Sequence, residues 1–201
     1  GDDCVAIKSG KNPEGDKVNI PTENVEIFDL HCTGGHGLAM GSEISGGINN
    51  INIHDCTVSN TLYGLQLKGT EKRGGGITNL YVQDCKLNLL LIKSNVGYNA
   101  DGEPAEDVPI FSGLTFRNVE VEGTIEIAGF DKTDCHNHYV NDTLFENVTL
   151  GSKSKPNSKI VMEYCDGLKF LNVRKYNGDT PEYQLNKKNY NILVDDNNIS
   201  E

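Results

Sequence analysis

A short apolar repeat occurs six times along the chain, and it limits the folds that the chain can adopt. The copies follow one template, which reads apolar, any, apolar, any, Asp or Asn, apolar, with a single Thr at the first position. Alternation over the first positions predicts a β-strand with one buried face. Successive copies begin 26, 29, 34, 29 and 25 residues apart, at Val25, Ile51, Leu80, Leu114, Thr143 and Leu168.

The fifth position of every copy breaks the alternation, and it is always Asp or Asn. These side chains bond to nearby backbone and tolerate left-handed geometry, so they suit a tight bend. If the copies stack one above another, the six side chains form a ladder. The six residues are Asp29, Asp55, Asp84, Asn118, Asn147 and Asn172.

A second set of short apolar strands lies between the copies, at residues 5–7, 38–40, 65–67, 90–92, 125–127 and 160–162. Two short strands in each repeat, with hardly any helical periodicity, indicate a β-solenoid. Two packed sheets also give short alternating strands, but they do not repeat one bend residue six times. We therefore predict an all-β, right-handed parallel β-helix over residues 1–175, followed by a polar tail around one short strand over 176–201.

Composition and motifs exclude several classes of partner. The formal net charge of −11 argues against a nucleic-acid-binding surface. No apolar run reaches the ~18 residues of a membrane span, so we expect no membrane partner. Segment 134–138 (DCHNH) holds possible metal ligands, but no second Cys or His cluster stands at zinc spacing. The chain also lacks phosphate-loop and dinucleotide motifs, so we expect neither a metal nor a cofactor.

Alignment of the second strands on their first apolar residue gathers reactive side chains into two columns. Asp3, His36 and Tyr63 fall two positions before the strands, and Lys8, Lys68 and Lys93 fall three positions after that residue. Equivalent positions on successive coils lie about 4.8 Å apart. Each residue alone has an ordinary structural explanation, but together they predict an acid centre beside a row of cations. Such a row suits a substrate that carries carboxylates at intervals.

The adjacent carboxylates Asp2 and Asp3 add chemistry to this predicted centre. Two carboxyl groups can divide into a proton donor and a water activator when their surroundings separate their pKa values. The imidazole of His36, flanked by Gly35 and Gly37, completes a set of groups for acid-assisted bond cleavage. We therefore take Asp2, Asp3 and His36 as the candidate catalytic residues.

Four segments, in order, resemble the polygalacturonase family of pectin-cleaving glycoside hydrolases, family twenty-eight. They are GDDCVAIKSG, CTGGHGLAMGSEISGG, YGLQLKG and KRGGGITNL, and the resemblance covers at least residues 1–130. It implies a parallel β-helix and the hydrolysis of α-1,4 galacturonosyl bonds with inversion. Inversion calls for two carboxyl groups roughly 6.5–9.5 Å apart, with a water between them.

The resemblance also implies roles for individual residues. Asp2 matches the acid that protonates the leaving oxygen, Asp3 matches a carboxylate that helps to activate water, and His36 matches a residue that supports the acid and the substrate geometry. Lys68 matches the lysine that binds a substrate carboxylate. We expect the rest of the substrate surface to comprise Lys8, Gly35, Gly37, Tyr63, Gln66 and Lys93.

The chain departs from the family pattern in two places. An Asn-Thr-Asp motif that should precede the paired aspartates is absent, so we expect the C-terminal portion of a longer enzyme, inactive by itself. The Arg-Ile-Lys motif appears as Gln66-Leu67-Lys68, which loses a charge and a bidentate fork. This loss leaves open a rhamnogalacturonan, a xylose-decorated galacturonan or another uronide-containing chain as the substrate. Segment 42–47 (SEISGG) resembles exo-acting members.

Two further function classes remain open beside the hydrolase. A β-helix polysaccharide lyase abstracts a proton next to a carboxylate, typically with Ca²⁺, and forms an unsaturated product. A non-catalytic carbohydrate-binding β-helix binds without hydrolysis, and the lost arginine slightly favours it. For the hydrolase, the expected partner is a pectic polysaccharide or oligogalacturonide, the expected state is a monomer, and the expected location is secreted or periplasmic.

Overall fold

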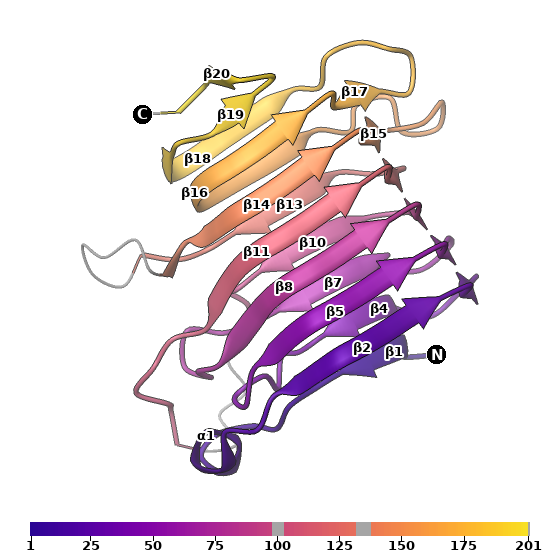
Figure 1. Ribbon diagram of the computed structural model, residues 1–201. Helices are drawn as coiled ribbons and strands as arrows, with labels where there is room; N and C mark the ends of the chain where they lie inside the picture. The colour runs from indigo at the N-terminus through magenta and orange to yellow at the C-terminus, as the bar shows by residue number, and fades with distance from the viewer. Residues whose placement is uncertain (98–102, 132–137, 201) are drawn as a thin grey trace.

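The structure is a computed structural model, and it describes residues 1–97, 103–131 and 138–200. In this part of the chain the backbone winds as a right-handed parallel β-helix, whose coils stack from the N-terminal end to the C-terminal end (Figure 1). The predicted fold is therefore confirmed. No helix in the described ranges is both long and apolar enough to cross a membrane.

Each coil has three faces, and the strands of one face pair in parallel with those of the coils above and below. The first face contains β1 (Asp3–Ile7), β4 (Gly37–Met40), β7 (Leu65–Lys68), β10 (Leu90–Lys93), β13 (Ile125–Ala128) and the first part of β16 (Ile160–Leu171). The second face contains β2 (Thr22–Phe28), β5 (Ile48–His54), β8 (Gly76–Gln83), β11 (Ile110–Arg117), β14 (Val140–Glu146) and the rest of β16. The third face contains β3 (His31–Cys32), β6 (Thr57–Val58), β9 (Lys86–Leu87), β12 (Glu120–Val121), β15 (Thr149–Leu150) and β17 (Arg174–Lys175).

The sequence repeat is the coil itself. The first residue of each copy pairs with the first residue of the next copy, from Val25 opposite Ile51 through to Thr143 opposite Leu168. The strands between the copies pair in the same way on the first face, with Leu65 opposite Leu90. Their inward side chains form one continuous apolar core. The register predicted for the second and first faces is confirmed, apart from one shift near Asp3 that is described below.

The bend residues stack, as predicted, at the corner between the second and third faces, and hydrogen bonds link Asp84, Asn118, Asn147 and Asn172. All six have positive φ values, between 51° and 55°. Asn118 donates a hydrogen bond from Nδ2 to Asp84 Oδ1 at 3.1 Å, and Asn147 donates to Asn118 Oδ1 at 3.2 Å. Asn172 continues the series by donating to Asn147 Oδ1 at 2.9 Å. We call this ladder the bend corner.

Residues 176–200, for which the sequence predicts a polar tail around one short strand, hold three strands and add a further coil. They contain β18 (Tyr183–Tyr190), β19 (Leu193–Val194) and β20 (Asn197–Asn198), and β18 and β19 both pair in parallel with β16. Ile192 is fully buried in the core. The apolar side chains of this coil are divided between different faces, and its register shifts between Glu163 and Cys165, so no alternating run is visible in the sequence.

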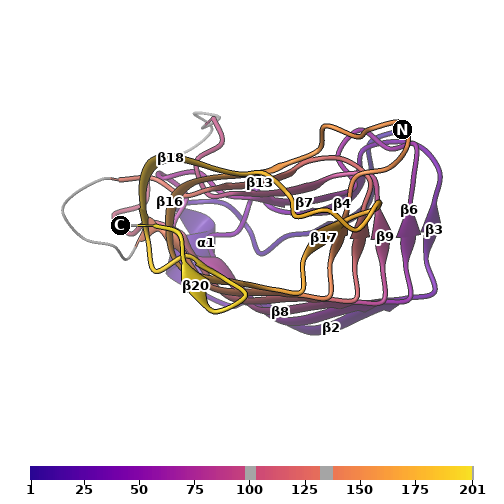
Figure 2. The ribbon, with the colours of Figure 1, turned by 90° about the horizontal axis from the view of Figure 1, so that it is seen from above.

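One short helix, α1 (Glu14–Val18), interrupts the first coil. Seen from above, it lies on the opposite side of the coil from the third face, and the N-terminus lies close to the third face (Figure 2). The beginning of the chain is thus held at the corner where the third face turns into the first. We call this second corner the site corner.

Candidate active site

The three predicted catalytic residues meet at the site corner. His36 Nδ1 lies 2.9 Å from Asp2 Oδ1 and 3.7 Å from Asp3 Oδ1. Asp3 Oδ2 also lies 3.6 Å from Lys68 Nζ. The ring of Tyr63 meets the His36 ring edge to face, with the ring centres 5.8 Å apart. The structure therefore joins the residues of the predicted acid centre and connects them to one lysine of the predicted row.

The alignment that predicted this cluster is wrong by one residue at its first member. Asp3 pairs with Gly37 and not with His36, because the register between β1 and β4 shifts between Asp3 and Val5. A bulge of this kind re-aims the side chains beside it. The shift leaves the Asp3 carboxylate between His36 and Lys68, in contact with both.

The glycines on either side of His36 have a structural reason to be there. Gly35 and Gly37 have φ values of 75° and 98°. A Cβ on Gly35 would lie 2.6 Å from the Asp2 carbonyl oxygen, and one on Gly37 would lie 2.2 Å from the Gly64 carbonyl oxygen. These distances leave no room for a side chain between the coils. The two glycines therefore allow the backbone that carries His36 to approach the coils on both sides.

The two carboxylates stand in different surroundings. The Asp2 side chain is 88% exposed, whereas the Asp3 side chain is only 13% exposed. A hydrogen bond from the Asp3 backbone N–H, 2.8 Å long, and the neighbouring His36 hold the pKa of Asp2 below its usual range. A proton donor needs the opposite, a raised pKa. In the free chain Asp2 is therefore an ionised carboxylate, without the proton that a donor needs.

The spacing of the cluster restricts what it can do alone. Asp2, Asp3 and His36 each present one possible ligand atom, and these atoms lie within 4.8 Å of one another. This is closer than the roughly 6.5–9.5 Å that admits a water between the two carboxyl groups of an inverting glycosidase. The atoms are close enough to share a metal ion, although the sequence carries no metal motif. Of segment 134–138, only His138 lies within the described residues.

The predicted row of cations is present, but two of its lysines are neutralised. Lys68 and Lys93 pair in register on neighbouring strands. Lys93 forms an ion pair with Glu126, and Lys8 Nζ lies 2.8 Å from Glu43 Oε2 and donates to the Gly41 carbonyl oxygen at 3.2 Å. Neither of these glutamate contacts was predicted from the sequence. The only available signal for Glu126 was its outward position in strand 125–127.

Gln66 lies on β7, two residues before Lys68. It is only 9% exposed, and it pairs in register with Ala39 on one side and Leu91 on the other. Its Oε1 atom is buried and has no hydrogen-bond partner. A buried acceptor without a donor is costly, and a substrate hydroxyl group is one way to satisfy it.

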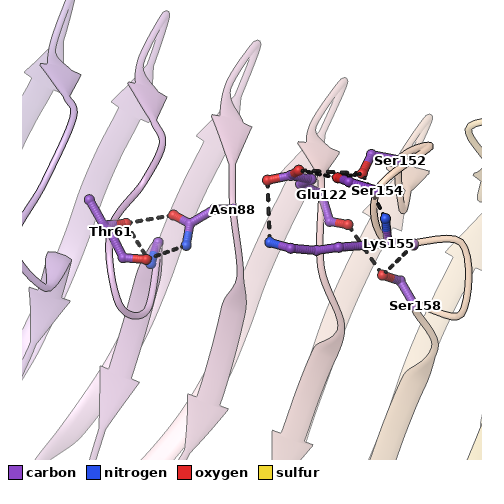
Figure 3. Close-up of polar contacts among 8 residues, drawn as sticks. Thr61, Asn88, Glu122, Ser152, Ser154, Lys155 and Ser158 are labelled. Carbon is purple, nitrogen blue, oxygen red and sulfur yellow. Dashed lines mark hydrogen bonds and ion pairs between the residues drawn. The ribbon is translucent and has the colours of Figure 1, made fainter.

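Two polar networks that the sequence did not reveal hold the loops of the site corner (Figure 3). Thr61 Oγ1 donates to Asn88 Oδ1, and Asn88 Nδ2 donates to the Thr61 carbonyl oxygen, both at 2.5 Å. The Gly64 N–H donates to Thr61 Oγ1 at 3.1 Å, so this network fixes the loop that carries Tyr63. Further along the corner, Glu122 accepts hydrogen bonds from three residues of the loop over 151–159, namely Ser152, Ser154 and Lys155.

Comparison with known proteins identifies relatives of this chain among the polygalacturonases. A probable polygalacturonase of Vitis vinifera is 31% identical over 129 residues, which make up 61% of this chain and 26% of that protein. An endopolygalacturonase of Emericella nidulans is 29% identical over 141 residues, 65% of this chain and 33% of that protein. The chain thus matches about a quarter to a third of the length of these relatives.

Two solved structures share the fold. The Yersinia enterocolitica family 28 exopolygalacturonase superposes with a TM-score of 0.71 at 22% identity, over 96% of this chain and 34% of that one. The hyperthermoactive exopolygalacturonase of Thermotoga maritima gives a TM-score of 0.65 at 25% identity, over 98% and 40%. The family model of the glycosyl hydrolases family 28 matches residues 1–173. With the repeat, the coil and the acidic cluster, this match shows that the chain belongs to glycosyl hydrolase family 28.

Proposed function

We propose that the chain carries the acid centre of a polygalacturonase that hydrolyses galacturonosyl bonds in pectin with inversion. The observation that carries the proposal is the connected cluster of Asp2, His36, Asp3 and Lys68 at the site corner. It places two carboxylates, an imidazole and a cation within contact of one another. Because pectin lies outside the cell, the proposal also makes the protein secreted or periplasmic, and it acts as a monomer.

Asp2 is the proton donor to the leaving oxygen, and its exposure explains how it becomes one. In the free chain water surrounds Asp2 and its pKa is lowered. A polysaccharide lying over the site removes this water, and desolvation raises the pKa of a carboxyl group. Asp2 therefore takes up the proton that it donates only when substrate covers it.

Asp3 and His36 orient the attacking water and the acid. Lys68 Nζ lies 3.6 Å from Asp3 Oδ2, which places a cation beside the carboxylate that helps to activate water. The short spacing between Asp2 and Asp3 means that the water needs a further group on its other side. We therefore expect this 201-residue chain to bind substrate but to hydrolyse it far more slowly than the full product of its gene.

Lys68 binds the carboxylate of the sugar next to the cleaved bond. Its Nζ lies 3.6 Å from Asp3, beyond the ~3.2 Å of a good hydrogen bond, so its donors remain available to a substrate. Removal of units from a chain end is supported by the two exopolygalacturonases that share the fold. A hydrolase of decorated pectin is a second candidate, because Gln66 cannot provide the charge of an arginine.

The test is product analysis on polygalacturonate, rhamnogalacturonan and short oligogalacturonides, with the full gene product and with this chain. The proposal predicts saturated monosaccharide from the full product, released from one end, with the anomeric configuration inverted. Loss of this product in the Asp2→Asn variant ties the reaction to the cluster. An unsaturated product would instead indicate a lyase. Binding without any hydrolysis by the full product would indicate a carbohydrate-binding β-helix.

A further inference from the structure

The three lysines of the first face are not equivalent. Lys8 lies on the coil of β1, Lys68 follows on β7 and Lys93 on β10, so the two outer lysines flank the central one along the stack. Each outer lysine is in close contact with a glutamate. Among the residues that the structure describes, the central lysine forms an ion pair with Asp3 alone, and this contact is long. Among the described residues of this face, Lys68 is thus the lysine best able to bind a new anion.

The partners of the outer lysines come from different elements. Glu43 lies in the turn after β4 and reaches back to Lys8 at 2.8 Å. Glu126 lies on β13 and reaches Lys93 on the preceding coil. Both glutamates are half-exposed, so a ligand on this face can reach them. A substrate carboxylate at either outer position would meet a like charge as well as the lysine.

Gln66, on the same strand as Lys68, adds an independent observation. Its Oε1 atom is buried without a partner, and it can only accept a hydrogen bond. An ionised carboxylate has no donor to offer, whereas a sugar hydroxyl group has one. Of the two polar atoms of this amide, Oε1 can therefore pair with a sugar hydroxyl group and not with an ionised carboxylate.

We propose that Glu43 and Glu126 determine the charge selectivity of this face. They neutralise Lys8 and Lys93, so that only the position of Lys68 accepts a substrate carboxylate and the flanking positions take uncharged sugar units. The substrate class is a chain in which an ionised uronate is flanked by neutral or esterified sugars. This inference rests on the proposed function, and it assigns a task to two glutamates that lie outside the acid centre.

The test measures binding of charged and uncharged ligands to variants of the whole chain. Titration calorimetry uses an oligogalacturonide and the same oligomer with its carboxylates methyl-esterified in part. The Glu126→Gln variant releases Lys93, so its affinity for the fully charged oligomer should rise on the order of three- to tenfold. Its affinity for the part-esterified oligomer should not change, because the variant alters charge and hardly alters shape.

Two further variants separate charge selectivity from a structural effect. The double variant Lys93→Gln/Glu126→Gln removes both members of the pair, and its affinity for the charged oligomer should return to that of the unmodified chain. The matched control is Glu120→Gln on β12, which breaks the Lys86–Glu120 ion pair of 3.1 Å on the third face. This control should leave the affinity for both oligomers unchanged. Thermal unfolding of each variant checks that the fold is intact.

The outcomes distinguish this inference from the proposed function. Binding of both oligomers with no gain for the charged one in Glu126→Gln would overturn the charge selectivity and leave the polygalacturonase proposal standing. The same gain in Glu120→Gln would also overturn it, because the effect would then come from net charge. Failure of the chain to bind any pectic oligomer would overturn the proposed function, and this inference with it.

Discussion

The two corners of the coil are built on opposite principles. At the bend corner, the passage from the second to the third face takes the same two positions in every coil, at 29–30, 55–56, 84–85, 118–119, 147–148 and 172–173. At the site corner, the passage from the third to the first face runs over 33–36, 59–64, 88–89, 122–124 and 151–159. Every connection at the bend corner has two residues and begins with Asp or Asn, whereas the connections at the site corner differ in length and in residue type from coil to coil.

This difference separates stability from function. The bend corner holds the coils in register through stacked Asp and Asn side chains, so a change there should affect unfolding and leave substrate binding intact. The site corner carries Asp2, His36 and Tyr63, each on a different coil. A change there should affect substrate and leave the stack intact. The predictions below test this separation, beginning with the largest expected effect.

Asp2→Asn should have the largest effect on the rate. The variant keeps the shape of the side chain but cannot donate a proton to the leaving oxygen, so kcat of the full gene product should fall by about 10³-fold or more. Oligogalacturonide affinity should stay within about twofold, because the substituted side chain is isosteric. Initial rates and calorimetry measure the two quantities. A kcat close to normal would exclude Asp2 as the acid.

His36→Ala should have the next largest effect. The variant removes the group that contacts both carboxylates, so kcat should fall by about 10²-fold. The unfolding midpoint in urea should hardly move, because His36 is half-exposed and lies outside the core. If the midpoint fell while the rate per folded molecule stayed the same, His36 would belong with the structural residues.

Substitution of Asn118, at the bend corner, should lower stability and leave substrate binding unchanged. Asn118→Ala loses two ladder hydrogen bonds and puts Ala, which tolerates left-handed backbone less well than Asn, at a φ of 54°, so the free energy of unfolding should fall by about 2 kcal/mol. Asn118→Gly is the matched variant, because it tolerates the left-handed backbone and loses only the side-chain bonds, and it should lose about half as much. Urea unfolding measures both. Any change of KM in either variant would break the separation of the two corners.

The substitution His54→Gln should have the smallest effect, a loss of stability that depends on pH. Hydrogen bonds to Asp55 at 2.7 Å and to Glu26 at 3.2 Å raise the pKa of His54 above its usual range. A raised pKa in the folded state adds stability that is complete below the unfolded pKa of about 6.5 and is lost as the pH rises through the folded value. The stability difference between the chain and His54→Gln should therefore shrink as the pH rises above about 6.5. A difference that grows with pH would contradict this assignment.

Most of the fold could be predicted because the repeat is periodic. The alternation at Val25 and its five counterparts determines which side chains face inward, and the Asp or Asn at each bend determines where the chain turns. The last coil was missed because its apolar residues, such as Leu185 and Ile192, lie on different faces. No local pattern marks such a coil.

The candidate site could be predicted only as a set of columns. Alignment brought Asp3, His36 and Tyr63 together, but it could not reveal the bulge that moves Asp3 beside Gly37. The glutamate partners of the lysines could not be predicted either. The contact of Glu126 with Lys93 depends on the direction of two long side chains on different coils. Residue spacing along a strand contains no information on such directions.

The separation of the two corners is tested most directly by titrating the isotopically labelled chain with an oligogalacturonide and following its backbone amide signals by NMR. This measurement needs binding and does not need turnover. We predict that the signals of residues 35–37 and 63–68 move with increasing ligand, while those of Asp84, Asn118 and Asn147 stay in place. Movement at the bend corner, or no movement at the site corner when the ligand is in large excess, would contradict the account.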